Sequence, residues 1–192
     1  MAAERNVMWS PWDEPGLEHL RLVQSDRGIV ADSMILRVKG GSPLRAQYRI
    51  HCDLAWNIQD VEISLMDSQC EAVRLRADGQ GHWTDESGSP LLLLEGCIDV
   101  DISVTPFTNT LPIRRLSLKP GQAADIAVVY IAVPEMDVKP VKQRYTCLQA
   151  SAEGGLYRYK GLSTGFTANL PVDGDGLVLD YPELCRRVWS SG

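Results

Sequence analysis

The chain has 192 residues, of which 44% are hydrophobic and 23% are charged, as in an ordinary globular protein. A chain of this length can bury roughly 70% of its unfolded surface, so we expect a single domain over residues 1–192 with its core at about 9–188. The net charge of −6 argues against a nucleic-acid binder, which needs a basic surface, and against electrostatic docking to anionic membranes.

The five cysteines are scattered, with no CxxC pair and no cluster with histidine at zinc-like spacing. We therefore expect no metal or cofactor, and reduced, buried thiols at Cys52, Cys70, Cys97, Cys147 and Cys185. The first ten residues lack the layout of a secretory signal, and no apolar run approaches the ~20 residues that span a bilayer. The sequence predicts a cytoplasmic protein without an integral membrane segment.

Nearly every periodic segment alternates with a period of two, which is typical of β-strands. In chain order the predicted strands cover residues 17–23, 28–39, 44–53, 57–66, 70–77, 97–105, 113–118, 125–133, 138–148, 156–160, 166–170 and 177–181. Turn-forming clusters such as Gly40–Pro43 and Asp173–Gly176 separate them. The best short helical candidate is the C-terminal stretch Tyr181–Val188. The pattern predicts an all-β chain.

The segment 125–133 is apolar on both faces, which indicates a strand buried on both sides. Since there are almost no helices to cover it, the sheet must curl over itself or enclose a lumen. A two-layer sandwich with a dry core fits the periodicity equally well. Pro140 indicates an edge, because proline cannot donate to a strand ladder. We therefore expect a single curved antiparallel sheet that forms a β-roll or partly open barrel.

The strand 97–105 places Asp99, Asp101, Ser103 and Thr105 on one face, opposite a row of Ile and Val. Side chains two residues apart on a strand are ~6.5–7 Å apart, which overlaps the ~6.5–9.5 Å between the carboxylates of inverting glycosidases. Glycosidase carboxylates, however, flank the bond from opposite sides, whereas these two lie side by side. The pair therefore favours ion pairs with Arg74, Arg76 or Arg115, or hydrogen bonds to a sugar, over catalysis.

The loop that follows combines Phe107 with Thr108, Asn109 and Thr110, which suits a sugar that has an apolar face and a hydrogen-bonding rim. The same polar groups could equally satisfy the backbone of the loop. In the predicted strand 113–118, Arg114 shares an apolar face with leucines, so its guanidinium should pair with a carboxylate or with an anionic head group. Trp83, Tyr145, Tyr157 and Tyr159 belong either to the core or to the mouth of a groove.

Several motifs together resemble a bacterial family assigned to glycolipid binding. They are Pro15–Leu20, Ala31–Ser33, Leu75–Asp85, Gly96–Arg115, Val141–Thr146 and Gly176–Pro182. The resemblance runs from about Trp9 to Val188, and it implies a spiral β-roll that is similar to the periplasmic carriers of lipoproteins. It also implies a glycolipid as the ligand. The chain differs from those carriers because no export signal is evident.

We hypothesise that the chain binds an amphipathic molecule such as a glycolipid, without catalysis or a cofactor. Apolar residues such as Ile126, Val128 and Tyr130, or their opposite-facing neighbours on the same strand, would hold an acyl chain. The expected ligand-binding residues are Asp99, Asp101, Thr105, Phe107, Asn109, Arg114, Arg115, Arg74, Arg76, Trp83 and Tyr145. Two alternatives stay open: a hydrolase of sugar conjugates that uses Asp99 and Asp101, and a protein-interaction module with an exposed sheet edge.

Overall fold

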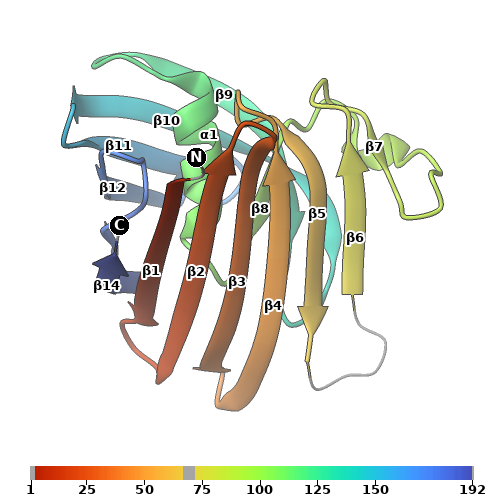
Figure 1. The fold of residues 1–192 in the computed structure, drawn as a ribbon, viewed down its shortest axis with the longest axis horizontal. Coiled ribbons are helices and arrows are strands. Elements are labelled where there is room, and N and C mark those ends of the chain that lie inside the picture. Colours follow the sequence, from red (N-terminus) through yellow and green to blue (C-terminus); the bar gives the residue numbers. More distant parts are fainter. Residues whose placement is uncertain (1–2, 67–71, 192) are drawn as a thin grey trace.

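The computed structural model describes residues 3–66 and 72–191, and its strands form two sheets (Figure 1). The nine-stranded sheet has the order β13-β14-β1-β2-β3-β4-β5-β6-β7 and the five-stranded sheet the order β12-β11-β10-β9-β8. The prediction of an all-β chain is confirmed. The first sheet comprises β1 (Ala3–Pro11), β2 (Gly16–Ser25), β3 (Gly28–Lys39), β4 (Ser42–Cys52), β5 (Ile58–Leu65), β6 (Ala72–Ala77), β7 (Trp83–Thr84), β13 (Asp180–Tyr181) and β14 (Cys185–Ser191). The second comprises β8 (Asp99–Ile102), β9 (Ala123–Ile131), β10 (Val138–Ser151), β11 (Gly154–Gly161) and β12 (Thr167–Asp173).

Strands β1 to β6 form an antiparallel meander in which alternate side chains enter the core. In β4, Tyr48 and Ile50 are buried, whereas Arg49 between them is exposed. Its neighbour across the ladder, Asp32, accepts hydrogen bonds from the Arg49 guanidinium on the outer face. This alternation follows directly from the period of two in the sequence, because one face of the strand contacts the core and the other contacts water.

The two sheets are joined by the segment between β12 and β13. The N–H of Leu179 donates to the carbonyl of Pro171 in β12 at 2.8 Å, and the N–H of Arg187 in β14 donates to the carbonyl of Leu179 at 2.8 Å. The segment therefore continues the hydrogen bonding from one sheet to the next, and the strands curl into a half-barrel. Among the described strand pairs, only β8 and β9 run parallel.

A short helical segment fills the interior of this roll: the 3-10 turn η2 (Phe107–Asn109) and the helix α1 (Thr110–Leu116). Figure 1 shows α1 between the two sheets. Phe107 and Leu111 have no exposed surface, and Ile113 is also buried. The prediction of a strand over 113–118 is therefore wrong. Seven residues are too few to display a helical period, and Pro112 is tolerated because the first turn of a helix leaves its N–H groups unpaired.

The predicted helix at Tyr181–Val188 is also wrong. Most of this stretch belongs to β13, a turn and β14, and β14 pairs antiparallel with β1, where Cys185 lies opposite Pro11. Pairing with a strand 174 to 185 residues earlier in the chain is a tertiary effect that local periodicity does not report. A further 3-10 turn, η1 (Leu92–Leu94), lies between β7 and β8.

The core is continuous between the sheets, and β9 is buried on both of its faces, with Val129 and Ile131 in the core cluster and Val128 on the opposite face. Val128, Val129 and Ile131 are buried, as expected for a strand that is apolar on both faces. Pro140 lies in the first part of β10, where β9 is paired but the β11 ladder has not yet begun. Cys52, Cys97, Cys147 and Cys185 are free and buried, as predicted, whereas Cys70 lies outside the described residues.

Candidate functional site

Two hollows lie at opposite ends of the roll, on either side of the helical segment. One has a volume of about 320 Å³ and lies where β11 ends; it is lined by Asp101, Ile102, Ser103, Thr105, Asn109, Tyr130, Tyr159, Phe166, Tyr181, Pro182, Glu183 and Leu184. We call it the aromatic pocket. The other has a volume of about 610 Å³ and lies where β11 begins, around Trp56, Arg114, Arg115, Tyr157 and the turn 173–176. We call it the arginine groove.

The wall of the aromatic pocket is a cluster of rings from separate elements. Tyr159 comes from β11, Phe166 from the turn before β12, and Tyr181 from β13. Their centroids lie 6.2 Å apart for Tyr159 and Phe166, and 6.3 Å apart for the other two pairs. Tyr130 of β9 completes the lining. Phe166 is 43% exposed, whereas Tyr181 is buried, so the cluster runs from the mouth of the pocket into the core.

Asp101 is the less exposed of the two carboxylates that line this pocket; the other is Glu183. Oδ2 of Asp101 accepts a hydrogen bond of 2.6 Å from Nε2 of Gln143, and its Oδ1 accepts one of 3.4 Å from the Thr108 hydroxyl. Burial raises the pKa of Asp101, and these two donors only partly oppose the shift. The charge of Asp101 in turn adds to the effect of burial in raising the pKa of Tyr159 and Tyr181. The charge of Asp101 therefore influences the pKa of both tyrosines.

Asp99 has a different environment from Asp101, although only one residue separates them. It has no exposed surface, and its oxygens accept hydrogen bonds from Nε and Nη2 of Arg115 at 3.0 and 2.6 Å. Burial raises the pKa of Asp99, and the Arg115 guanidinium opposes that shift. A carboxylate without exposed surface does not contact a ligand. Asp99 and Asp101 therefore do not flank a shared ligand, as the two carboxylates of a glycosidase would.

Other residues predicted to bind ligand lie at the inner end of the aromatic pocket. Thr105 and Asn109 line it but are buried and engaged in the fold. The hydroxyl of Thr105 donates to Oε1 of Glu18 at 2.7 Å, and Oδ1 of Asn109 accepts from the hydroxyl of Tyr145 at 2.8 Å. Tyr145 lies in the core behind the pocket. Phe107, which is wholly buried, is stacked on another core ring, Tyr48, at 6.3 Å.

Arg114 lies in the arginine groove, on the helix rather than on the apolar face of a strand. Its guanidinium carbon lies 5.3 Å from the centroid of the Trp56 ring, and its Nη1 donates to the carbonyl of Gly174 at 3.4 Å. The aliphatic part of its side chain packs against Gly176. The contacts of Arg114 are therefore made with an aromatic face and a backbone carbonyl, and the sequence-based expectation that it occupies an apolar strand face is wrong.

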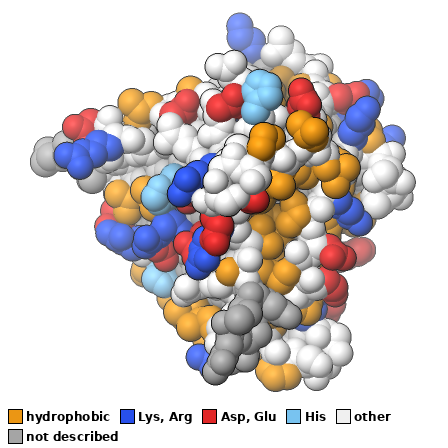
Figure 2. Space-filling model, turned by 90° about the vertical axis from the view of Figure 1, so that its right-hand side faces the viewer, with side chains coloured by type: hydrophobic (Ala, Val, Ile, Leu, Met, Phe, Trp, Pro, Cys, Tyr) orange, Lys and Arg blue, Asp and Glu red, His pale blue; other side chains and the backbone are white. Residues whose placement is uncertain are grey.

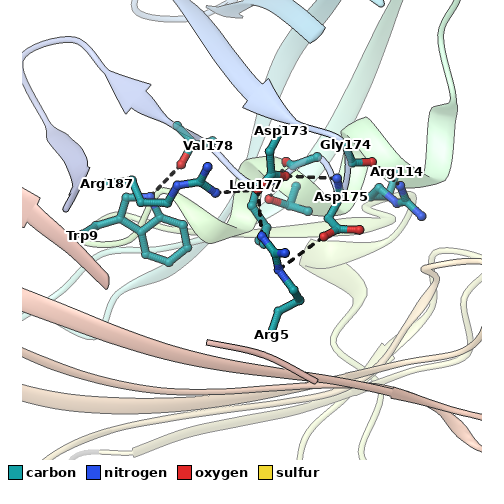
Figure 3. Close-up of polar contacts among 11 residues, drawn as sticks. Arg5, Trp9, Arg114, Asp173, Gly174, Asp175, Leu177, Val178 and Arg187 are labelled. Carbon is teal, nitrogen blue, oxygen red and sulfur yellow. Dashed lines mark hydrogen bonds and ion pairs between the residues drawn. The ribbon is translucent and has the colours of Figure 1, made fainter. Parts of the chain in front are cut away.

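The turn that forms the wall of the arginine groove is held by Asp173 (Figure 3). Oδ1 of Asp173 accepts hydrogen bonds of 3.0 Å from the N–H groups of Asp175 and Leu177. Its Oδ2 pairs with the guanidinium groups of Arg5 and Arg187. These partners come from β1 and β14, so the turn predicted at residues 173–176 also anchors one sheet to the other.

The remaining predicted residues lie away from both hollows, on β6 and β7. Arg74 pairs with Glu62 at 2.8 Å and with Glu86 at 3.1 Å, and Arg76 is exposed on the same strand opposite Asp60. Trp83 is buried, and its Nε1 donates to the carbonyl of Cys97 at 2.7 Å. Figure 2 shows Lys and Arg interspersed with Asp and Glu on the left of the face that it presents, while hydrophobic side chains gather toward the right.

Sequence reasoning missed two rings of the aromatic pocket, Phe166 and Tyr181, and singled out the other two, Tyr130 and Tyr159. Tyr130, Phe166 and Tyr181 lie near the ends of predicted strands, and Tyr159 and Phe166 flank a single turn. Because consecutive antiparallel strands return to the same edge, aromatic residues on either side of a turn are brought together. That signal was available. Ile126 and Val128, which were expected to hold an acyl chain, line neither hollow, and Val128 is in the core.

Fold and site together define an all-β roll whose interior is filled by a short helix and whose two ends are hollowed. Within residues 3–66 and 72–191, no helix is long and apolar enough to cross a membrane, and no three His, Cys, Asp or Glu residues group as metal ligands. The chain belongs to the protein family described as "Putative glycolipid-binding", whose model matches residues 6–187. This confirms the resemblance found in the sequence motifs.

The chain is similar to a DUF1089 family protein from Pseudomonas aeruginosa, with 38% identity and a TM-score of 0.78 over 93% of this chain and 92% of that one. It also shares its fold with a β-barrel-like DUF1849 domain protein from Brucella abortus, at 9% identity and a TM-score of 0.58, over 98% and 97% of the two chains. No curated protein matches the chain.

Proposed function

We propose that this protein binds the sugar head group of a glycolipid in the aromatic pocket. The observation that carries the proposal is the pocket that Tyr130, Tyr159, Phe166 and Tyr181 form together with the partly buried carboxylate of Asp101. A sugar ring has an apolar face that packs on aromatic rings, and hydroxyls that donate to a carboxylate. The volume of about 320 Å³ lies at the lower end of the range for small-ligand pockets.

The filled interior decides how an amphipathic ligand would lie. Phe107, Leu111 and Ile113 occupy the space that an empty roll would offer to an acyl chain. The head group would therefore enter the pocket, and the acyl chain would remain at its mouth, beside the exposed ring of Phe166 and the partly buried Leu184. Affinity then comes from packing of the sugar on the rings and from burial of the acyl chain at the mouth, which contributes about 0.8 kcal/mol per buried methylene. Asp101 orients the head group.

The proposal is tested with the purified protein and octyl β-D-glucoside below its critical micelle concentration. Binding is followed by isothermal titration calorimetry for the unmodified protein and for the Phe166→Ala and Trp189→Ala variants. Phe166 and Trp189 are 43% and 49% exposed, so neither substitution removes a buried side chain. We expect Phe166→Ala to weaken binding at least about fivefold, by loss of a stacking face, and Trp189→Ala to leave it unchanged. Equal affinity in all three proteins would contradict the proposal.

Native mass spectrometry of the protein purified from its own host extends the test to the natural ligand. A bound mass that fragments into sugar and acyl parts would support the proposal. If incubation with a bacterial lipid extract adds no mass to the protein, the aromatic pocket does not serve this function.

A protein-interaction role would depend on another surface. Leu92 and Leu93 of η1 are 77% and 71% exposed, although leucines are usually buried. If this surface recruits a partner, the double substitution of both leucines by serine would abolish recruitment and leave octyl glucoside binding intact.

A further inference from the structure

The aromatic pocket is acidic. Among its lining residues, the ionisable groups other than tyrosine are Asp101 and Glu183, and none is a lysine, arginine or histidine. Glu183 is exposed, whereas Asp101 is partly buried and lines the pocket together with the rings. A ligand group with a negative charge would be repelled by both carboxylates. The pocket therefore selects groups that are neutral or positively charged.

Asp101 and Glu18 are shielded carboxylates whose hydrogen-bond partners are all neutral, but Glu18 is 4% exposed and lines neither hollow, whereas Asp101 lines the aromatic pocket. Asp99 has the guanidinium of Arg115, and Asp173 has those of Arg5 and Arg187. Asp101 is hydrogen-bonded only to the neutral groups of Gln143 and Thr108, and no ion pair of the described residues includes it. A buried carboxylate without a counter-charge is costly, since hydrogen bonds from neutral donors offset only part of the lost hydration.

The rings around Asp101 suit a cation as well. The face of an aromatic ring carries negative potential, which attracts an ammonium group within about 6 Å of the centroid. One such contact already exists at the edge of the pocket: Nζ of Lys139 lies 5.7 Å from the centroid of Tyr130. Lys139 is exposed on β10 and contacts the ring rather than the carboxylate, so it leaves Asp101 without a charged partner.

We propose that the group bound in the aromatic pocket carries a positive charge, as an amino sugar does, and that Asp101 is its counter-ion. This inference rests on the proposed function and specifies the chemical class of the head group. A neutral sugar fills the same space and donates to the same oxygens, but it leaves the charge of Asp101 uncompensated. An ammonium group satisfies the hydrogen bonds and the charge together.

The test compares three ligands that differ in one substituent: methyl β-D-glucosaminide, methyl β-D-glucoside and methyl N-acetyl-β-D-glucosaminide. Each is titrated into the protein by NMR at a pH where the amine is protonated and Asp101 is ionised. We expect the glucosaminide to bind about tenfold more tightly than the other two, with an advantage that shrinks as salt is added. In Asp101→Asn we expect that advantage to disappear while weak binding of the neutral glycoside is retained.

Two variants keep the test decisive if Asp101→Asn does not fold. Glu183→Gln removes the exposed carboxylate at the rim and is expected to lower the preference for the charged ligand by about twofold to threefold. Lys139→Met removes the nearby competing cation and is expected to increase it. If both variants keep the preference of the unmodified protein for the charged glycoside, the charged groups of the pocket do not distinguish charged from neutral ligands, and the inference is wrong.

The outcomes separate this inference from the proposed function. Equal affinity for the charged and neutral glycosides would overturn the inference and leave sugar binding in place. If no glycoside binds, the proposed function fails, and the inference is then decided by tetramethylammonium alone. Chemical-shift changes at Tyr159 and Tyr181 with that cation would support a cation site without a sugar, and their absence would overturn the inference as well.

Discussion

Arg115 donates two hydrogen bonds to Asp99, from Nε at 3.0 Å and from Nη2 at 2.6 Å, and so ties α1 to β8 inside the roll. The Asp99 side chain has no exposed surface and that of Arg115 is 17% exposed, so the pair is shielded from water. The helical segment that this pair holds separates the two hollows. The contact is thus one reason why the ends of the roll offer two sites rather than one continuous channel.

Substitution of Arg115 by alanine would leave the carboxylate of Asp99 buried without its partner. We expect Arg115→Ala to lower the free energy of unfolding by about 3–5 kcal/mol, and Arg114→Ala to lower it by about 1 kcal/mol or less. The adjacent Arg114 is the matched control, because its guanidinium lies over Trp56 and donates to a carbonyl, and no ion pair of the described residues includes it. Urea denaturation of the three proteins measures both values. Equal losses in the two variants would show that the ion pair does not anchor the helix.

Glu18 makes stability depend on pH. Its Oε1 accepts hydrogen bonds from Ser33, Tyr48 and Thr105, whereas Oε2 is buried without a partner. Burial raises the pKa of Glu18 from 4.5 to about 7. Between these values the folded protein retains a proton that the unfolded chain has lost, so this group contributes less stability as the pH rises from about 5 to about 7.

The contribution of Glu18 is isolated by comparison with Glu18→Gln, which retains the acceptor and cannot ionise. Between about pH 5 and pH 7 we expect the free energy of unfolding of the unmodified protein to fall by on the order of 3 kcal/mol relative to that of this variant. Thermal unfolding of both proteins across this range gives the difference, in which the effects of other groups cancel. A difference that does not change with pH would mean that Glu18 ionises normally.

Gly176 is placed where a side chain would meet the helix. Its φ of +79° is unfavourable for other residues, and a Cβ there would lie 3.0 Å from Cδ of Arg114. Gly121 is the control: its φ is +86°, but a Cβ there would meet nothing within 4 Å. We expect Gly121→Ala to cost about 1 kcal/mol of unfolding free energy and Gly176→Ala to cost more. Calorimetric unfolding compares the two. If the two substitutions lower the free energy of unfolding equally, the Arg114 side chain moves aside without loss of stability.

The four buried thiols should react slowly in the folded protein. Thiolates are the reactive form, and burial raises the pKa of Cys52 to about 12 and that of Cys97 and Cys185 above its usual value. We expect Cys52, Cys97, Cys147 and Cys185 to be alkylated by iodoacetamide at least about a hundredfold more slowly in the native state than in denaturant. Peptide mass spectrometry at timed quenches gives the rate at each position. Fast native labelling at Cys52 or Cys185 would indicate local opening of that strand.

The strands of the meander could be predicted well because their signal is local. In β3 and β4 each buried residue is followed by a more exposed one over most of the strand, and the predicted range 28–39 coincides with β3. The strands β1 and β14 were missed, since they pair with each other from opposite ends of the chain. The helix α1 was read as a strand because the stretch Ile113–Leu118 alternates by chance over a length shorter than two helical turns.

For the site, the sequence identified Asp101, Thr105 and Asn109, which line the aromatic pocket, and Arg114 and Arg115, which line the arginine groove. It grouped them with Asp99, Phe107 and Tyr145, which are buried, and with Arg74, Arg76 and Trp83, which lie on other strands. Parity along a strand reports which side chains share a face. It does not report whether that face is covered by another segment, and here the helical segment covers most of it.

By itself the sequence determined that the chain folds as β-strands, that the four described thiols are buried, and to which family it belongs. These properties follow from side-chain periodicity, from composition and from motifs, all of which are local along the chain. Tertiary structure alone decided that α1 fills the roll, that Asp99 is paired with Arg115, and that Asp101 shares a pocket with aromatic rings from β9, β11 and β13. The physical reason is that burial and charge pairing depend on which distant segments cover a residue, and only the closed fold brings those segments together.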